Sequence, residues 1–253
     1  MSLVNLFSGA VAGVSKPSWR AFPNMAVENL SKRKPGKEAL LDAAEDMFSR
    51  VGYHGASLRE IAKAAGFELG LASYHFGKKD ELFRQVVSRR MLDSKAMALA
   101  WLERGLASAG ANVTASVVIE AYIRDRFTQL FEMGPAWSNY SKLSLHFIAL
   151  EERGALIGDF RIVAQEIFDA YVNALAATMP NARREIVARG FELVRLTLAA
   201  MVIDPKTIDL LPDRSNMEEI IEGLIAFFEG GFQSVAQGVA VAPAVSVSQR
   251  NKK

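Results

Sequence analysis

Five polar residues in the first third of the chain carry groups that bind phosphate. Tyr74 and His75 end one short apolar-periodic segment, Lys78 and Lys79 begin the next, and Ser57 starts the segment before them. Hydroxyl, imidazole and ammonium groups at helix ends donate hydrogen bonds to phosphate oxygens, and a helix N-terminus adds the positive end of its dipole. This set of donors predicts binding of a polyanion with repeating phosphates.

The residue types that catalysis needs are scarce. The chain has 3 His and no Cys, which excludes a thiolate nucleophile, a disulfide framework and a thiolate metal site. It has no nucleophile elbow, His-Glu-x-x-His pair, phosphate-binding loop or dinucleotide fingerprint. Glu218, Glu219 and Glu222 lie close together, but a di-metal carboxylate site also needs a Glu-x-x-His, which is missing. We therefore expect no enzyme activity, no metal and no cofactor.

Short helices are predicted to position the donors. Apolar residues at helical spacing predict a first helix over 37–51, which Gly52 ends. Ser57 and Glu60 form a capping box that starts a second helix, and Gly66 suits the left-handed conformation that stops it.

A third, very short helix carries Leu69, Ala72 and Phe76, and a fourth starts near Lys79. Helices this short are marginal in water unless their neighbours pack behind them. Two short helices that are joined by a tight turn and packed on a supporting helix form the helix-turn-helix arrangement. Its second helix enters the DNA major groove. The spacing alone also fits a compact helical core with no role in DNA binding.

Positive charge concentrates in the same part of the chain. Residues 32–104 hold 14 Lys and Arg against 10 Asp and Glu, a net charge of +4, whereas the chain as a whole has +2. Lys32, Arg33 and Lys34 stand just before the first helix. They could form an arm that reaches the minor groove or the DNA backbone, and a disordered basic linker is the alternative.

The rest of the chain predicts longer helices. Apolar-periodic segments occupy about 113–132, 138–152, 155–178, 182–203 and 216–236, with Gly and Pro between them. The fold class is therefore all-α. We expect a flexible N-terminal extension over 1–35, a helix-turn-helix domain over 36–83, a larger helical bundle over 84–237 and a flexible tail over 238–253.

The segment ALLDAAEDMFSRVGYHGASLREIAKAAGFELGLASYHFGKKDELF resembles the DNA-binding domain of the TetR family of bacterial regulators. The resemblance implies a homodimer of all-helical subunits. Each subunit would have an N-terminal DNA-binding domain and a C-terminal domain that binds a small organic effector and dimerises. Most members of the family repress transcription and release their operator when the effector binds.

The expected DNA-contacting residues lie on or beside the third helix. They are Lys37, Ser57, Leu69, Gly70, Leu71, Ser73, Tyr74, His75, Lys78 and Lys79. The sequence departs from the family at Glu68, the expected cap of the third helix, where Ser, Thr or Asn is common. Leu69, Leu71 and Ala72 stand where side chains that donate hydrogen bonds to bases could be. Apolar contacts with thymine methyl groups and recognition of DNA shape would therefore contribute to sequence recognition.

Candidate effector-binding residues are aromatic or polar residues of the larger bundle. They are Trp101, Tyr122, Arg126, Phe127, Trp137, Asn139, His146 and Phe168. A ligand pocket is mostly apolar with a few directional polar groups. At helical spacing, however, each aromatic residue also fits a plain core position.

The last two long helices, at about 182–203 and 216–236, are the expected homodimer interface. The apolar contacts would come from Ile186, Phe191, Val194, Leu198, Ile221, Leu224, Ile225 and Phe228. Gly223, Gly230 and Gly231 fit a close approach of helices or a kink.

We thus expect a cytoplasmic, DNA-binding transcriptional repressor that an apolar organic effector releases from its operator. No apolar run reaches the roughly 18 residues of a membrane span. The alternative is a non-catalytic helical scaffold that binds other proteins, which would need none of the TetR-like residues.

Overall fold

The computed structural model describes residues 35–149, 158–203 and 217–237, and within these ranges all regular structure is helical. The N-terminal helices are α1 (Pro35–Gly55), α2 (Leu58–Ala64), α3 (Leu69–Phe76) and α4 (Lys79–Ser88). The longer helices are α5 (Met91–Ala109), α6 (Ala115–Phe127), α7 (Pro135–Ala149), α8 (Gly158–Thr178), α9 (Arg184–Ile203) and α11 (Met217–Ala236), and a π-helical turn, η3 (Thr128–Glu132), follows α6. The expected extension before Pro35 and the expected tail at 238–253 lie outside the described residues.

Local sequence signals set the ends of the short helices. Gly52 has φ 69°, which interrupts the helical geometry of α1 at the expected residue. Gly66 has φ 78° just after α2, a conformation that residues with a Cβ rarely adopt. The Ser57 hydroxyl oxygen accepts a hydrogen bond from the Glu60 N–H at 3.2 Å, as expected of an N-cap. The Glu60 carboxylate accepts from that same hydroxyl at 2.6 Å, so the second half of the capping box differs from the expected bond to a backbone N–H.

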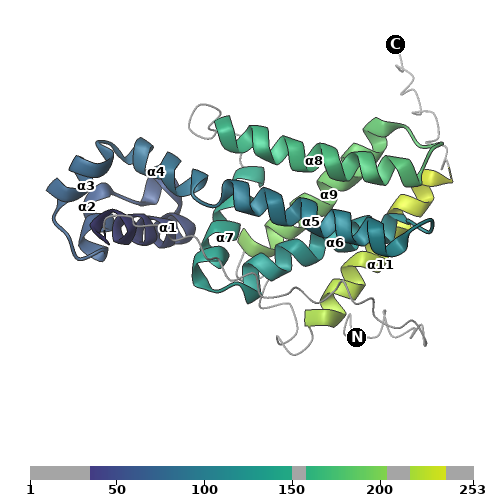
Figure 1. Ribbon diagram of the computed structural model, residues 1–253, viewed down its shortest axis with the longest axis horizontal. Coiled ribbons are helices and arrows are strands. Elements are labelled where there is room, and N and C mark those ends of the chain that lie inside the picture. Colours follow the sequence, from purple (N-terminus) through teal and green to yellow (C-terminus); the bar gives the residue numbers. More distant parts are fainter. Residues whose placement is uncertain (1–34, 150–157, 204–216, 238–253) are drawn as a thin grey trace, which may run out of the picture.

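The four N-terminal helices share one apolar core. Leu40, Ile61, Leu82 and Phe83 are completely buried in it. Phe48 and Phe83 meet edge to face, with ring centroids 5.0 Å apart. Leu143 of α7 and Phe160 of α8 also belong to this core and join the short helices to the larger bundle. Figure 1 shows α2 and α3 at the end of the molecule farthest from α11.

A second core fills the larger bundle. The rings of Tyr122, Tyr171 and Phe191 pack together, with centroids 4.9 to 5.5 Å apart. The buried Tyr171 hydroxyl donates to the Ala98 carbonyl oxygen at 2.7 Å, so α8 and α5 are joined by a satisfied polar contact. The helix α5, which begins directly after α4, was not distinguished as a separate element by the sequence pattern.

A cluster of charges joins the N-terminal helices to α5. Arg89 donates to Glu38 and Asp42 at 2.6 Å and to Glu45 at 3.4 Å, and Arg90 donates to Glu45 at 3.1 Å. Burial raises the pKa of Glu45, an effect that the two arginines oppose. The cluster therefore ties α1 to the junction between α4 and α5.

The two helices α9 and α11 approach each other closely at Gly190. A Cβ at this position would lie 2.9 Å from a ring carbon of Phe232, whose side chain is buried. Gly190→Ala is therefore expected to destabilise the protein by about 1–3 kcal/mol through overpacking. Gly223→Ala is the control, because nothing lies within 4 Å of its Cβ position and alanine favours the helix by up to about 1 kcal/mol. Urea unfolding at one protein concentration measures both, and a Gly190→Ala variant as stable as the parent would contradict the close approach.

Candidate nucleic-acid interface and ligand pocket

One face of α3 is open to solvent. Tyr74 is 78% exposed and Leu69 is 43% exposed, and Gly70 and Ser73 are exposed beside them. These positions repeat with the spacing of one helix face, and α3 lies at an outer end of the molecule (Figure 1). The face combines an apolar residue, a hydroxyl and a phenol, which suits contacts to base edges and to sugar-phosphate.

Two residues expected on the exposed face of α3 point elsewhere. Ala72 is completely buried, and Leu71 is half-buried against the start of α1 and Phe67. Tertiary packing of such a short helix requires apolar side chains on its inner face, so these two hold α3 in place. Ala72 is therefore closed off from the thymine methyl groups that it was expected to contact, whereas the contact expected of the half-buried Leu71 stays a prediction.

The charged and capping residues around α3 differ in how exposed they are and in what their side chains contact. Lys78 is exposed at the N-terminal cap of α4, and His75 is half-buried with its ring centroid 5.2 Å from that of Tyr74. The ammonium group of Lys37 lies 5.6 Å from the centroid of the Phe76 ring. Glu68 stands at the cap of α3 without a capping side-chain hydrogen bond, contrary to expectation.

Lys79 has an internal role that its sequence position did not reveal. Its ammonium group donates to the carbonyl oxygens of Tyr53 and Ala56 at 2.9 Å each and lies over the Tyr53 ring at 4.3 Å. Two of its three donors are thus engaged with the end of α1 and the turn after it. One N–H of the Lys79 ammonium group therefore remains for the hydrogen bond that was expected with phosphate.

This difference between neighbouring lysines can be tested. Lys79→Met is expected to cost about 1–3 kcal/mol of unfolding free energy because it leaves two carbonyl acceptors without their charged donor. Lys78→Met is expected to leave the stability within about 0.5 kcal/mol, as most surface substitutions do. Urea unfolding of both variants is the measurement, and equal stabilities would contradict the structural role of Lys79.

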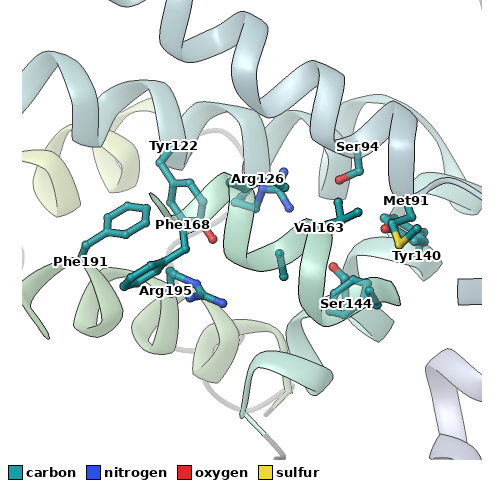
Figure 2. Close-up of a pocket in the computed structure, with 13 residues that line it drawn as sticks. Met91, Ser94, Tyr122, Arg126, Tyr140, Ser144, Val163, Phe168, Phe191 and Arg195 are labelled. Carbon is teal, nitrogen blue, oxygen red and sulfur yellow. The ribbon is translucent and has the colours of Figure 1, made fainter. Parts of the chain in front are cut away.

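A small cavity lies in the larger bundle, between α5, α6, α7, α8 and α9 (Figure 2). Of the expected ligand-binding residues, Tyr122, Arg126 and Phe168 line it. The space open to the centres of water molecules is about 30 Å³. The wall also includes Met91, Ser94, Tyr140, Ser144, Phe160, Val163, Ala164, Ile167, Phe191 and Arg195.

The other expected ligand-binding residues do not line this cavity. Trp101 and Phe127 are buried in the second core. Trp137 is buried against Tyr140 and the guanidinium of Arg90, and Asn139 is half-buried outside the wall. The side chain of His146 lies outside the described residues.

A buried polar network runs behind the cavity. The Nε of Arg126 donates to Asp125 at 2.8 Å, Gln129 donates to Asp125 at 2.8 Å, and Ser94 donates to Gln129 at 3.1 Å. Burial raises the pKa of Asp125, and Arg126 lowers it in part. Burial disfavours the charged form of Arg126, but Asp125 and Tyr122 outweigh this effect, so the pKa of Arg126 lies above its usual value. Arg126 therefore remains a cation inside the bundle.

Sequence reasoning missed Arg195 and Tyr140. Arg195 was not singled out in the sequence, yet its side chain is only 14% exposed and its guanidinium lies 5.0 Å from the centroid of the Phe168 ring. Burial raises the pKa of Tyr140 well above its usual value. The available signal was weak: both are polar residues within apolar-periodic segments.

Among the described side chains, no group of three or more His, Asp or Glu is arranged to hold a metal ion. Within the described ranges, no helix is long and apolar enough to cross a bilayer.

Two sequence models of known families match the chain. The model described as "Bacterial regulatory proteins, tetR family" matches residues 40–86, which cover α2 and α3 and most of α1 and α4. The model described as "Tetracyclin repressor-like, C-terminal domain" matches residues 120–231, which cover most of the larger bundle. The two models match in one chain in the order that a regulator of this kind requires.

Individual relatives and structures agree with these matches. The HTH-type transcriptional regulator RutR of Escherichia coli strain K12 is 39% identical over 72 residues, which are 27% of this chain and 34% of RutR, so the match spans about a third of that relative. Mycobacterium smegmatis AmtR has a similar fold, with a TM-score of 0.52 and 19% identity over 83% of this chain and 96% of AmtR. So does AibR, solved in complex with isovaleryl coenzyme A and operator DNA, with a TM-score of 0.54 and 17% identity over 76% of this chain and 97% of AibR. The protein belongs to the TetR family of helix-turn-helix transcriptional regulators.

Proposed function

We propose that the protein is a cytoplasmic, homodimeric repressor that a small, largely apolar organic effector releases from its operator. The observation that carries the proposal is the exposed face of α3, with Tyr74 and Ser73 open to solvent on a helix whose inner face is fixed by Ala72 and Phe76. Residues 36–83 would bind DNA, and residues 84–237 would bind the effector and dimerise.

The proposed DNA contacts follow from exposure. Leu69, Gly70, Ser73 and Tyr74 would enter the major groove. Lys37, Ser57, His75 and Lys78 would hold phosphates at its edges, with the remaining N–H of Lys79 beside them. The Ser57 hydroxyl already donates to the Glu60 carboxylate. Ser57 would therefore bind a phosphate through its backbone N–H together with this hydroxyl.

The proposed dimer would use α9 and α11, but by other side chains than the sequence pattern favoured. Phe191, Val194, Leu198, Ile221, Ile225 and Phe228 are buried in the core of their own subunit. Leu193 and Leu196 of α9 are instead 61% and 40% exposed, and Phe227 of α11 is 68% exposed. Large apolar groups left in water on adjacent helices favour association with a second copy.

Phe227→Asp is expected to convert the protein from dimer to monomer, because it places a charge in the centre of the proposed apolar interface. Ile162→Asp on α8 is the matched control, since Ile162 is 62% exposed but lies outside α9 and α11. Sedimentation velocity measures the mass of each variant. A Phe227→Asp variant that remains a dimer would exclude this face.

The proposed signal from effector to DNA passes through the start of α5. Met91 and Ser94 of this helix line the cavity, and Arg89 and Arg90 just before it hold α1 through Glu45. An effector that displaces the first turn of α5 would therefore move the DNA-binding helices as a unit. In a dimer the two α3 helices must lie about 34–36 Å apart to enter successive major grooves, so a shift of a few ångströms defeats simultaneous binding.

The test is a fluorescence-anisotropy titration against DNA from upstream of the protein's own gene, at two salt concentrations and with excess unrelated DNA. We expect tight, salt-sensitive binding that survives the competitor. Lys78→Met should lower the slope of log affinity against log salt by about 1, the value for loss of one phosphate contact. Absence of DNA affinity even at low salt would contradict the proposal and favour a helical scaffold.

A further inference from the structure

The cavity of the larger bundle is rich in hydrogen-bond donors. Its wall contains two arginines, Arg126 from α6 and Arg195 from α9, and no aspartate or glutamate among the residues that the structure describes. Figure 2 shows the two arginines entering from opposite sides, with Tyr122 and Phe168 near them. The carboxylates that pair with these arginines, Asp125 and Glu192, are outside the wall.

Arg126 and Tyr122 present unused donors to this space although both are almost fully buried. Arg126 is 7% exposed, and its Nε and one Nη donate to Asp125. Its other Nη has no hydrogen-bond acceptor within the described part of the chain. The Tyr122 hydroxyl, on a residue 3% exposed, also makes no hydrogen bond to the described residues. Among the described side chains, the one fully enclosed N or O atom without a hydrogen-bond partner is the Ser141 hydroxyl oxygen, so the donors of Arg126 and Tyr122 border open space instead of being sealed in the core. Donors that face a cavity in this way suit a ligand that accepts hydrogen bonds.

Arg195 adds a second cation from the opposite wall. One of its Nη atoms donates to Glu192 at 2.9 Å, while its Nε and other Nη have no acceptor among the described residues. Its guanidinium is held over the Phe168 ring, which limits its movement. The cavity therefore lies between two guanidinium groups, each with a counter-charge behind it and with N–H donors that have no acceptor among the described residues.

We propose that the effector is an organic anion, a carboxylate with a short apolar tail, held by Arg126, Arg195 and Tyr122. A carboxylate has two oxygens that accept from planar guanidinium groups, and charge-assisted hydrogen bonds of this kind are the strong ones. Val163, Ile167 and Phe191 supply apolar contacts for the tail. This inference rests on the proposed function, since it names the chemical class of the effector.

The size of the cavity indicates how such a ligand acts. A cavity of about 30 Å³ by this measure holds one or two water molecules, which is room for a carboxylate but not for a tail. Entry of the tail must therefore push the walls apart. Met91 and Ser94 are part of these walls, so the displacement reaches the first turn of α5.

The experiment compares acids with their neutral isosteres on the full-length protein. The probes are hexanoate and 3-phenylpropanoate, each beside its primary amide, at millimolar concentration. Thermal unfolding and isothermal calorimetry measure binding, and the anisotropy assay measures release of DNA. We expect the acids to bind at least about tenfold more tightly than the amides, the effect of losing one charged hydrogen bond.

Variants locate the site. Arg195→Gln should weaken binding of the acids at least about tenfold without changing the affinity of the amides. Arg184→Gln on the same helix is the control, because Arg184 is exposed and pairs with Asp169 outside the cavity. The double variant Asp125→Asn/Arg126→Gln, which removes both charges of a buried pair, should weaken the acids likewise. Amides that bind as tightly as the acids, or acids that do not bind, would overturn the inference. The affinity for DNA in the absence of ligand, measured in the anisotropy assay, tests the proposed function separately.

Discussion

Arg89→Met is expected to destabilise the protein by about 3–5 kcal/mol, the usual cost of removing one partner from a buried ion pair. The Arg89 side chain is 8% exposed and bonds to Glu38, Asp42 and Glu45, of which Glu45 is 2% exposed. Without Arg89, these carboxylates are left close together with less positive charge to offset them. Urea unfolding measures the loss, and DNA affinity should fall with it because the cluster fixes α1 against α4.

Two further variants make this result specific. Arg84→Met on α4 removes an exposed pair with Glu81 and is expected to cost no more than about 1 kcal/mol. Adding Glu45→Gln to Arg89→Met should recover part of the stability, because it removes the uncompensated buried charge. If Arg89→Met and Arg84→Met cost the same, the cluster has no special structural role.

Phe191→Ala is expected to cost about 3–5 kcal/mol, as other deletions of a buried aromatic ring do. Phe191 is fully buried, and its ring lies 4.9 Å from that of Tyr122 and 5.5 Å from those of Phe168 and Tyr171. Loss of the ring leaves a void between α6, α8 and α9, in the wall of the cavity of the larger bundle. Urea unfolding at a fixed protein concentration measures the change.

The control for Phe191 is Leu92→Ala. Leu92 is 64% exposed on α5, so its truncation should change the stability by no more than about 0.5 kcal/mol. A Phe191→Ala variant within this range of the parent would contradict the packing of the Phe191 ring against Tyr122, Phe168 and Tyr171.

The elements and their ends were predictable where the cause is local. Ser57 caps α2 and Gly66 follows it because a hydroxyl and a missing Cβ act over a few residues of chain. Most of the longer helices begin and end within a few residues of the bounds of the expected apolar-periodic segments, because the Gly and Pro residues between these segments also act locally. The break between α4 and α5 was not predictable, because no Gly or Pro marks it and the two arginines there are held by a distant segment, α1.

The site was less predictable because it depends on which face of a helix turns inward. Val194 is buried and Leu193 is exposed, although both are apolar neighbours in one helix. Lys78 and Lys79 look equivalent in the sequence, yet only Lys79 reaches the carbonyl groups near the end of α1. The role of Arg195 likewise depends on α8 lying beside α9, which places Phe168 under its guanidinium.

The measurement that tests the central claim most directly is a selection of bound sequences from a pool of random double-stranded DNA. A dimer that inserts two α3 helices into successive major grooves predicts an enriched inverted repeat whose half-site centres lie about one helical turn apart. The Tyr74→Ala/Lys78→Met double variant, selected in parallel, should enrich it weakly or not at all. A pool that shows no enriched sequence, or the same enrichment with the double variant, would contradict DNA recognition through the exposed face of α3.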